Sequence, residues 1–169
     1  NDYTVKKRLC GIGMLNTTAA WELGAVGPTL RGSGVASDTR TEGYAAYDGL
    51  TFGPIVEKDG DCYARCMVRV REIYQSFDLM RQMIAKLPEG PVETKVTGAP
   101  NGEYFARLEQ PRGEVIYYVK GNGKRNLERF RVRTPTFANV PPLLKMLQGC
   151  DLADVGVIVL TIDPCISCA

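Results

Sequence analysis

A run of apolar residues at helical spacing constrains the fold of this chain more than any other feature of its sequence. In "CYARCMVRVREIYQSFDLMRQMIAKL", steps of three and four separate the apolar side chains, which are Met67, Val70, Ile73, Tyr74, Phe77, Met80, Ile84 and Leu87. This period places them in one stripe along a helix. Asp59 or Asp61 is suited to begin the helix, and Pro88 to end it. A helix of more than about twenty residues is long for a small domain, so we expect it to span the core of a larger body.

Period-two alternation follows the helical segment and predicts a small sheet. Three strands are expected in "EYFARLEQ", "GEVIYYVKG" and "LERFRVRTP". The turn signals "PRG" and "GNGK" lie between consecutive strands. Strands joined by short turns pair antiparallel, so an antiparallel sheet is expected.

Shorter segments around these two features predict further helices. "NTTAAWELG" has a helix cap at Asn16 or Thr17, and "VPPLLKMLQG" has proline in its first turn. The glycine-rich stretch 27–49 is expected to be a long loop, and "VGVIVLTI" suits a buried strand or helix. The sequence therefore predicts an α+β fold in which a long core helix and further helices accompany a small sheet, in a single domain over residues 1–169.

Composition excludes several functions. A net charge of +2 is too small to favour nucleic acid or an anionic membrane as a partner. No apolar run reaches the ~18 residues that a membrane span needs. The chain contains no histidine, which removes the usual general base and the commonest metal ligand. Its six cysteines lack the spacing of a secreted disulfide framework, so a reducing, cytosolic compartment fits better.

The cysteines nearest the end of the chain have three possible roles. Cys165 and Cys168 form a Cys-x-x-Cys pair in "DPCISC". A thioredoxin-type redox pair needs a helix after its first cysteine, and a structural zinc needs four ligands. The third role is half of a site for another thiophilic metal, with the other half supplied elsewhere. Cys62 and Cys66 share a helix face, but small thiols on such a face are usually core residues.

Several motifs in a fixed order make the sequence recognisable. They are "GPTLRGSGVASDTR", "GDCYARCMVRVREI", "LPEGPV", "EQPRGEVIYYV", "RTPTFAN" and the terminal "DPCISC". As a set they resemble the large subunit of nickel–iron hydrogenases, most closely the energy-converting, membrane-bound type. They also resemble its relative, the quinone-proximal subunit of respiratory complex I. The complex I relative is not expected to keep nickel-binding cysteines, so the pair in this chain favours the hydrogenase.

The resemblance implies a role for the two cysteines. In the hydrogenase family, four thiolates from two Cys-x-x-Cys pairs hold nickel, and two of them bridge to an iron that carries carbon monoxide and cyanide. By resemblance, Cys165 is a terminal nickel ligand and Cys168 a nickel–iron bridge. Soft sulfur ligands suit a nickel that changes oxidation state.

Five further residues acquire expected roles from the resemblance, and Pro111 is one of those that would contact the bound metal centre. Arg112, next to Pro111 in "QPRG", would lie over the metal centre, donate hydrogen bonds to cyanide, and act as electrostatic partner or base when hydrogen is split. Pro135 and Thr136 would contact the second cyanide, and Asp163 would orient Arg112. We expect both cysteines to face the interior near the Pro111–Arg112 turn. Without the resemblance, Arg112 would be interpreted as an exposed hairpin arginine and Asp163 as a turn residue.

The first cysteine pair of the family is absent, so the chain is expected to be the C-terminal portion of a large subunit, either a piece or one half of a split protein. The implied partners are the N-terminal part of that subunit, a small iron–sulfur subunit and membrane subunits. Together they would reduce protons or oxidise hydrogen at the cytoplasmic face of the cell membrane. The alternatives are a complex I-like structural subunit without nickel, linked to quinone and NAD chemistry, and a zinc-stabilised module.

Overall fold

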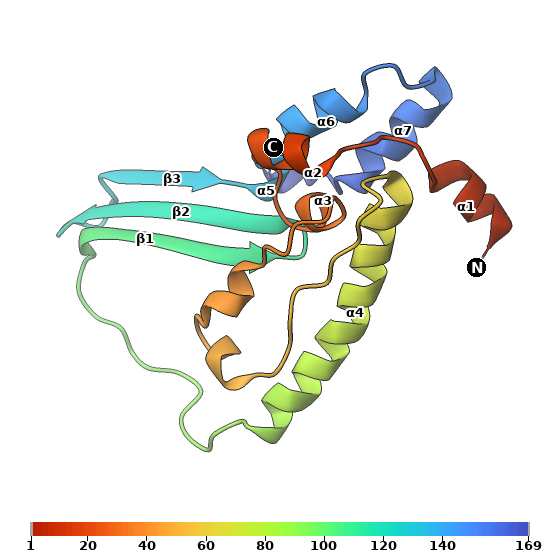
Figure 1. The fold of residues 1–169 in the computed structure, drawn as a ribbon. Coiled ribbons are helices and arrows are strands. Elements are labelled where there is room, and N and C mark those ends of the chain that lie inside the picture. Colours follow the sequence, from red (N-terminus) through yellow and green to blue (C-terminus); the bar gives the residue numbers. More distant parts are fainter. Residues whose placement is uncertain (1, 169) are drawn as a thin grey trace.

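A single long helix dominates the structure, a computed structural model that describes residues 2–168. Helix α4 (Cys62–Ala85) begins at Asp61, whose carboxylate accepts a hydrogen bond of 2.7 Å from the Ala64 N–H. It ends at Lys86, two residues before Pro88. In Figure 1, α4 runs down one side of the molecule and the sheet extends on the other.

The face that α4 buries is not its apolar stripe. Buried side chains on α4 are Cys62, Ala64, Arg65, Val68 and Leu79. Stripe residues are substantially exposed, for example Tyr74 at 71%, Phe77 at 48% and Ile84 at 75%. Residues 2–168 therefore leave most of the stripe uncovered. The apolar face of α4 does not pack against the core that these residues form.

The sheet has three antiparallel strands in the order β1-β2-β3. Strand β1 (Asn101–Gln110) turns directly into β2 (Gly113–Asn122), and β2 pairs with the shorter β3 (Arg129–Arg133). Tyr104, Val119 and Phe130 are directly opposite one another, so they share one face. Only the inner end of the sheet reaches the core, where Val115 is fully buried.

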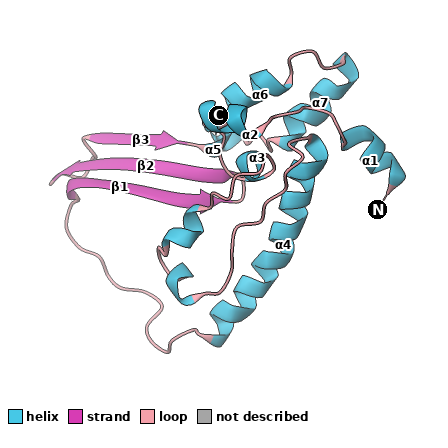
Figure 2. Cartoon of the chain, viewed as in Figure 1, coloured by secondary structure: helices cyan, strands magenta, loops and turns pink. Residues whose placement is uncertain are grey.

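Short helices form the rest of the body, as Figure 2 shows in cyan. They are α1 (Tyr3–Leu9), α2 (Thr17–Glu22), α5 (Pro135–Ala138), α6 (Val140–Met146) and α7 (Leu152–Thr161). The main hydrophobic cluster joins them to the start of α4 through residues such as Leu15, Met146 and Ile158. These elements and the antiparallel sheet confirm the predicted α+β class.

One expectation about local structure is wrong. The stretch 27–49, expected to be loop, contains helix α3 (Pro28–Arg31) and two 3-10 turns, η1 (Thr39–Glu42) and η2 (Tyr47–Gly49). Several of its polar residues are buried, including Arg31, Asp38 and Arg40. These turns are stabilised by buried ion pairs, including pairs with distant segments, and not by an apolar stripe. The sequence therefore shows no helical spacing of apolar residues here. Across residues 2–168, no helix is both long and apolar enough to cross a membrane.

Candidate metal-thiolate site

The two cysteines lie in a short tail that follows α7 and is fixed to α5. The Cys165 N–H donates a hydrogen bond of 3.1 Å to the Thr136 hydroxyl. The Thr134 hydroxyl, which also caps α5, donates to the carbonyl of Cys168. Between these two contacts the tail forms the 3-10 turn η3 (Ile166–Cys168). The tail is therefore fastened on both sides of the thiol pair.

The turn between β1 and β2 brings Arg112 to the same place. Arg112 Nε lies 3.1 Å from the Asp163 carbonyl oxygen and 3.2 Å from Asp163 Oδ2. Asp163 holds this position with a φ of +54°, a left-handed conformation that Asp tolerates better than most residues. Segments more than 25 residues apart in the chain thus meet beside Cys165.

A contact between two glycines fixes the Arg112 turn. A Cβ on Gly27, at the start of α3, would lie 2.3 Å from Gly113 Cα and 2.6 Å from the Arg112 carbonyl oxygen. Only glycine allows the two backbones to approach so closely, and Gly27 also has a φ of +63°. The first turn of α3 therefore sets the position of the hairpin that presents Arg112.

The predicted site residues differ in exposure. Pro135 and Thr136 are buried at the start of α5, whereas Pro111 is exposed. Both thiols are half-buried rather than interior, although they lie near the Arg112 turn as expected. An open side of the thiol pair is therefore available to another chain or to a ligand.

The two thiols interact with each other. A hydrogen bond from the Cys168 thiol lowers the pKa of Cys165, and the positive charge of Arg112 acts in the same direction. The same hydrogen bond raises the pKa of Cys168. One sulfur thus accepts while the other donates, so Cys165 is the one that becomes a thiolate first.

Two arginines of α4 hold the approach to the tail, and the sequence did not reveal them. Arg65 Nε donates to the Thr161 hydroxyl at 3.0 Å, and Arg69 donates to the Thr161 carbonyl at 2.9 Å. A terminal nitrogen of Arg69 also lies 3.7 Å from Asp163 Oδ2. Burial lowers the pKa of Arg69, and the Asp163 carboxylate opposes that shift.

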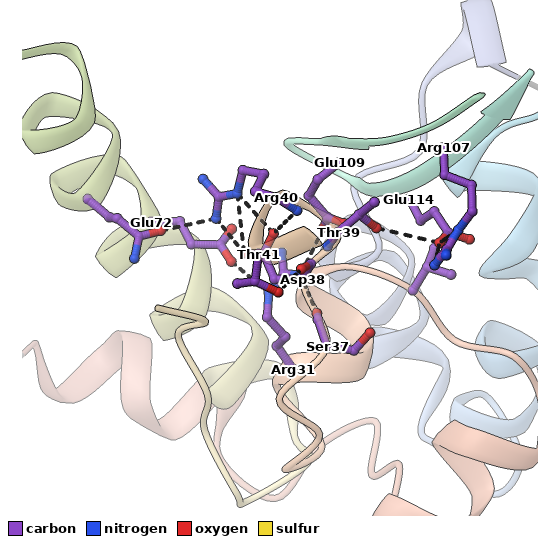
Figure 3. Close-up of polar contacts among 12 residues, drawn as sticks. Arg31, Ser37, Asp38, Thr39, Arg40, Thr41, Glu72, Arg107, Glu109 and Glu114 are labelled. Atoms are coloured by element: carbon purple, nitrogen blue, oxygen red, sulfur yellow. Dashed lines mark hydrogen bonds and ion pairs between the residues drawn. The ribbon is translucent and has the colours of Figure 1, made fainter. Parts of the chain in front are cut away.

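A pocket of about 380 Å³ adjoins the tail. Its lining includes Asp163, Pro111 and Arg69 on the side of the cysteines and Arg31, Glu72 and Glu109 on the other. Arg31 is 1% exposed and donates to Glu72 and Glu109 at 2.8 Å each. Figure 3 shows these pairs with Asp38 and Arg40 between helix and sheet.

The pKa values of two carboxyl groups in this network, Glu72 and Asp38, shift in opposite directions. Burial raises the pKa of Glu72 in spite of its neighbours Arg31 and Arg40. Burial also acts to raise the pKa of Asp38, but the hydrogen bond from Arg40 and the charge of Arg31 outweigh it, so the pKa is lowered.

A sequence signal for the α4 residues Arg65, Arg69 and Glu72 does exist. Their steps of four and three place them on one side of α4.

The donor set fits half of a soft-metal site. Two thiols within hydrogen-bonding reach of each other are suitable ligands for a thiophilic metal. Residues 2–168 contain no group of three or more His, Cys, Asp or Glu side chains arranged to hold a metal ion. Cys62 is buried in the hydrophobic cluster and close to Arg65, and Cys10 is exposed near the other end of the chain. Neither joins Cys165 and Cys168.

Comparison with known proteins supports the motif-based resemblance. The family model described as "Respiratory-chain NADH dehydrogenase, 49 Kd subunit" matches residues 1–99 and 94–169. The carbon monoxide-induced hydrogenase of Rhodospirillum rubrum is 42% identical over 167 residues, which is 98% of this chain and 46% of that protein. The alpha subunit of the membrane-bound hydrogenase of Pyrococcus furiosus is 37% identical over 99% of this chain and 44% of its own length.

Relatives named for quinone chemistry are equally similar. An NADH-quinone oxidoreductase subunit of Herpetosiphon aurantiacus is 39% identical over 96% of this chain and 46% of its own length. Among solved structures, a chain of an archaeal membrane-bound sulfane sulfur reductase complex superposes with a TM-score of 0.90 at 35% identity, covering 98% of this chain and 47% of that one. The chain thus spans slightly less than half the length of these relatives.

Proposed function

Because the chain belongs to the family of the 49-kDa subunit of respiratory NADH dehydrogenase, which includes membrane-bound hydrogenase subunits, we propose that it is part of a nickel–iron hydrogenase large subunit. Relatives of both kinds are oxidoreductases by name. In this proposal the chain supplies half of the nickel ligands of an enzyme that oxidises hydrogen or reduces protons.

The convergence of Arg112, Asp163 and Thr136 on the cysteine pair is the observation that carries the proposal. Overall identity does not choose between hydrogenase and quinone oxidoreductase, since the values are 42% and 39%. A half-buried pair of thiols that interact with each other and feel the charge of a guanidinium is the environment in which thiolates form and bind metal. A subunit with no metal to hold has no need of that arrangement.

Each residue has a task in the proposed site. Cys165 and Cys168 would hold the metal centre, whose nickel and iron, with carbon monoxide and cyanide on the iron, supply the redox chemistry when bound. Arg112 makes its contacts with Asp163 through Nε, so its terminal nitrogens are oriented by that carboxylate and can donate to a diatomic ligand. A guanidinium fixed in this way can also receive or stabilise charge as hydrogen is split.

Thr136 would complete the second side of the site. Its hydroxyl accepts from the Cys165 N–H and still has a proton to donate toward a second cyanide. Pro135, buried before it, keeps the backbone rigid at this point and limits access of water. These two residues would therefore hold both the tail and a ligand.

Completion of the site requires other polypeptide. The remaining two thiolates would come from the N-terminal part of the large subunit, electrons would pass through an iron–sulfur cluster of a small subunit, and membrane subunits would anchor the complex at the inner face of the cell membrane. The Pyrococcus relative and the sulfane sulfur reductase are both membrane-bound by name, which supports this assembly.

The second candidate is a quinone-linked structural subunit without nickel, favoured by the similarity to the NADH-quinone oxidoreductase subunit of Herpetosiphon. Elemental analysis of the complex purified with all its subunits separates the possibilities. Nickel that is lost in Cys165→Ser and Cys168→Ser but retained in the exposed control Cys10→Ser supports the hydrogenase, whereas iron of the iron–sulfur subunit remains in all three variants. Zinc in place of nickel indicates a structural metal module, and absence of both metals indicates the quinone-linked subunit.

A further inference from the structure

We propose that Arg69 is a positioning residue for the thiol pair, which it controls through Asp163 and Arg112. This inference rests on the proposed function, because the role of the thiols as metal ligands comes from there. Arg69 is on α4, which bears none of the residues that the proposed function uses to hold the metal centre or its ligands. Its side chain is 23% exposed and points to the junction of α7 with the cysteine tail.

Arg69 holds this junction at two points. It donates to the Thr161 carbonyl at 2.9 Å, and it lies 3.7 Å from Asp163 Oδ2. The first contact satisfies a carbonyl at the C-terminus of α7, where the helix leaves such groups without partners. A positive charge also suits the negative end of the helix.

The carboxylate of Asp163 lies between two arginines. Arg112 Nε is 3.2 Å from the same Oδ2 that Arg69 approaches. The charge of Arg112 lowers the pKa of Arg69, so the two guanidiniums repel each other, and Asp163 offsets that repulsion. Without Arg69, the side chain of Asp163 would be held by Arg112 alone. Its left-handed backbone conformation, with a φ of +54°, would then have less support from its surroundings.

The consequence reaches the thiols through Asp163 and Arg112. Asp163 is two residues before Cys165, and its carbonyl and carboxylate both contact Arg112 Nε. If Asp163 moves, the backbone that leads into the thiol pair shifts and Arg112 loses its fixed orientation. Groups that orient the direct surroundings of a metal in this way typically contribute about 10–100-fold to activity or metal affinity.

Variants of the assembled complex test the proposal. Arg69→Met keeps an unbranched apolar stem but removes both contacts, and Arg69→Lys keeps the charge with a single donor nitrogen. Arg71→Met is the matched control, since Arg71 is on the same helix but more than half exposed and paired with Glu57. The first readout is amide hydrogen exchange in the peptide 161–168, which can be measured whether or not the complex contains metal and is compared between samples of equal metal content.

In Arg69→Met, we expect the amides of this peptide to exchange at least about tenfold faster than in wild type. The exchange rate in Arg69→Lys should lie between these two, and the rate in Arg71→Met should equal that of wild type. In a complex that contains nickel, Arg69→Met should also shift the infrared bands of the cyanide ligands and lower hydrogen uptake about 10–100-fold. Wild-type exchange of the peptide in Arg69→Met would overturn the proposal. If Arg69→Met does not assemble, Arg69→Lys decides in the same way.

Failure of the proposed function gives a different result. A wild-type complex without nickel contradicts the hydrogenase assignment, yet the exchange of peptide 161–168 still shows whether Arg69 holds the tail. Faster exchange with unchanged infrared bands in a nickel-containing complex would limit Arg69 to anchoring the tail and would overturn its control of the thiol site.

Discussion

Arg112 shows how one side chain can be placed for chemistry by its inner nitrogen. Its Nε contacts both the carbonyl and the carboxylate of Asp163, so the planar group is oriented before any ligand arrives. Lysine cannot reproduce this geometry, because its only nitrogen is at the tip of the chain. In the proposed site, the guanidinium plane rather than the charge alone would be the feature that matters.

We therefore expect Arg112→Lys in the full enzyme to lower hydrogen uptake strongly, by about 10-fold or more, while nickel is retained. Uptake with an artificial electron acceptor and elemental analysis of the same sample check this. Arg131→Lys, an exposed strand position, serves as the control. Hydrogen uptake equal to wild type in Arg112→Lys would exclude a catalytic role for Arg112.

Asp38 gives a prediction about pH. Its pKa in the folded chain is below the ordinary value of 3.8, so its stabilising effect is present above about pH 4 and is lost as pH falls through the folded pKa. Asp38→Asn should cost roughly 1.5–3 kcal/mol of unfolding free energy at pH 7, because the buried Arg40 loses its charged acceptor. The difference from wild type should shrink as pH falls.

Urea denaturation of both proteins between pH 7 and pH 2 measures that difference. The comparison with a variant is needed because Glu72 acts in the opposite sense. Its pKa is raised by burial, so its contribution favours the folded state below its ordinary pKa and is lost as pH rises through the folded pKa. A constant gap between Asp38→Asn and wild type over the whole range would contradict the assigned ion pair.

Among the elements, the contact of α3 with the β1–β2 hairpin matters most for the site. Gly27→Ala would place a methyl group against Gly113 and the Arg112 carbonyl, which must then move. We expect a loss of at least about 1–3 kcal/mol in stability and weaker hydrogen uptake, since the hairpin carries Arg112. Gly123→Ala is the control, because Gly123 has a similar φ of +74° in open space.

Denaturation midpoints and hydrogen uptake of the two glycine variants can be compared directly. Gly123→Ala should lose only the cost of its backbone conformation, about 1–2 kcal/mol, and keep its activity. Equal behaviour of Gly27→Ala and Gly123→Ala would mean that the close contact with the hairpin has no influence on the site.

Sequence periodicity predicted the elements with a strong pattern and missed those without one. The long helix, the three strands and the cap at Asn16 were all readable from local spacing. Helix α3 and the turns η1 and η2 were not, because buried pairs such as Arg31 with Glu109 join residues 78 positions apart. Arg69 and Glu72 resemble solvated helix charges for the same reason, since their partners lie in distant segments.

At the scale of the whole molecule, the exposed stripe of α4 is the main feature. Together with the site, which contains only two thiols, it predicts how the isolated chain behaves. It should contain no stoichiometric nickel and no hydrogenase activity, and it should self-associate through apolar surface. Elemental analysis and sedimentation velocity check the two parts.

Phe77→Lys together with Ile84→Lys should reduce that self-association, whereas Leu152→Lys, at an exposed apolar position on helix α7, should not. In the assembled complex, the same pair of substitutions should impair subunit assembly. Stoichiometric nickel in the isolated chain, without any added polypeptide, would show that the site is complete and that no further thiolates are required.

The order of the strands has a consequence for the isolated chain. Two strands form the borders of the sheet, and they differ in protection. On β3, Arg129, Arg131 and Arg133 repeat at every second position, and such charges oppose the addition of another strand. On β1, the outer residues 101–105 are exposed and include Tyr104 and Phe105. Copies of the isolated chain should therefore aggregate by edge-to-edge pairing at β1, and in the proposed complex prompt assembly would be a condition for keeping this polypeptide in solution.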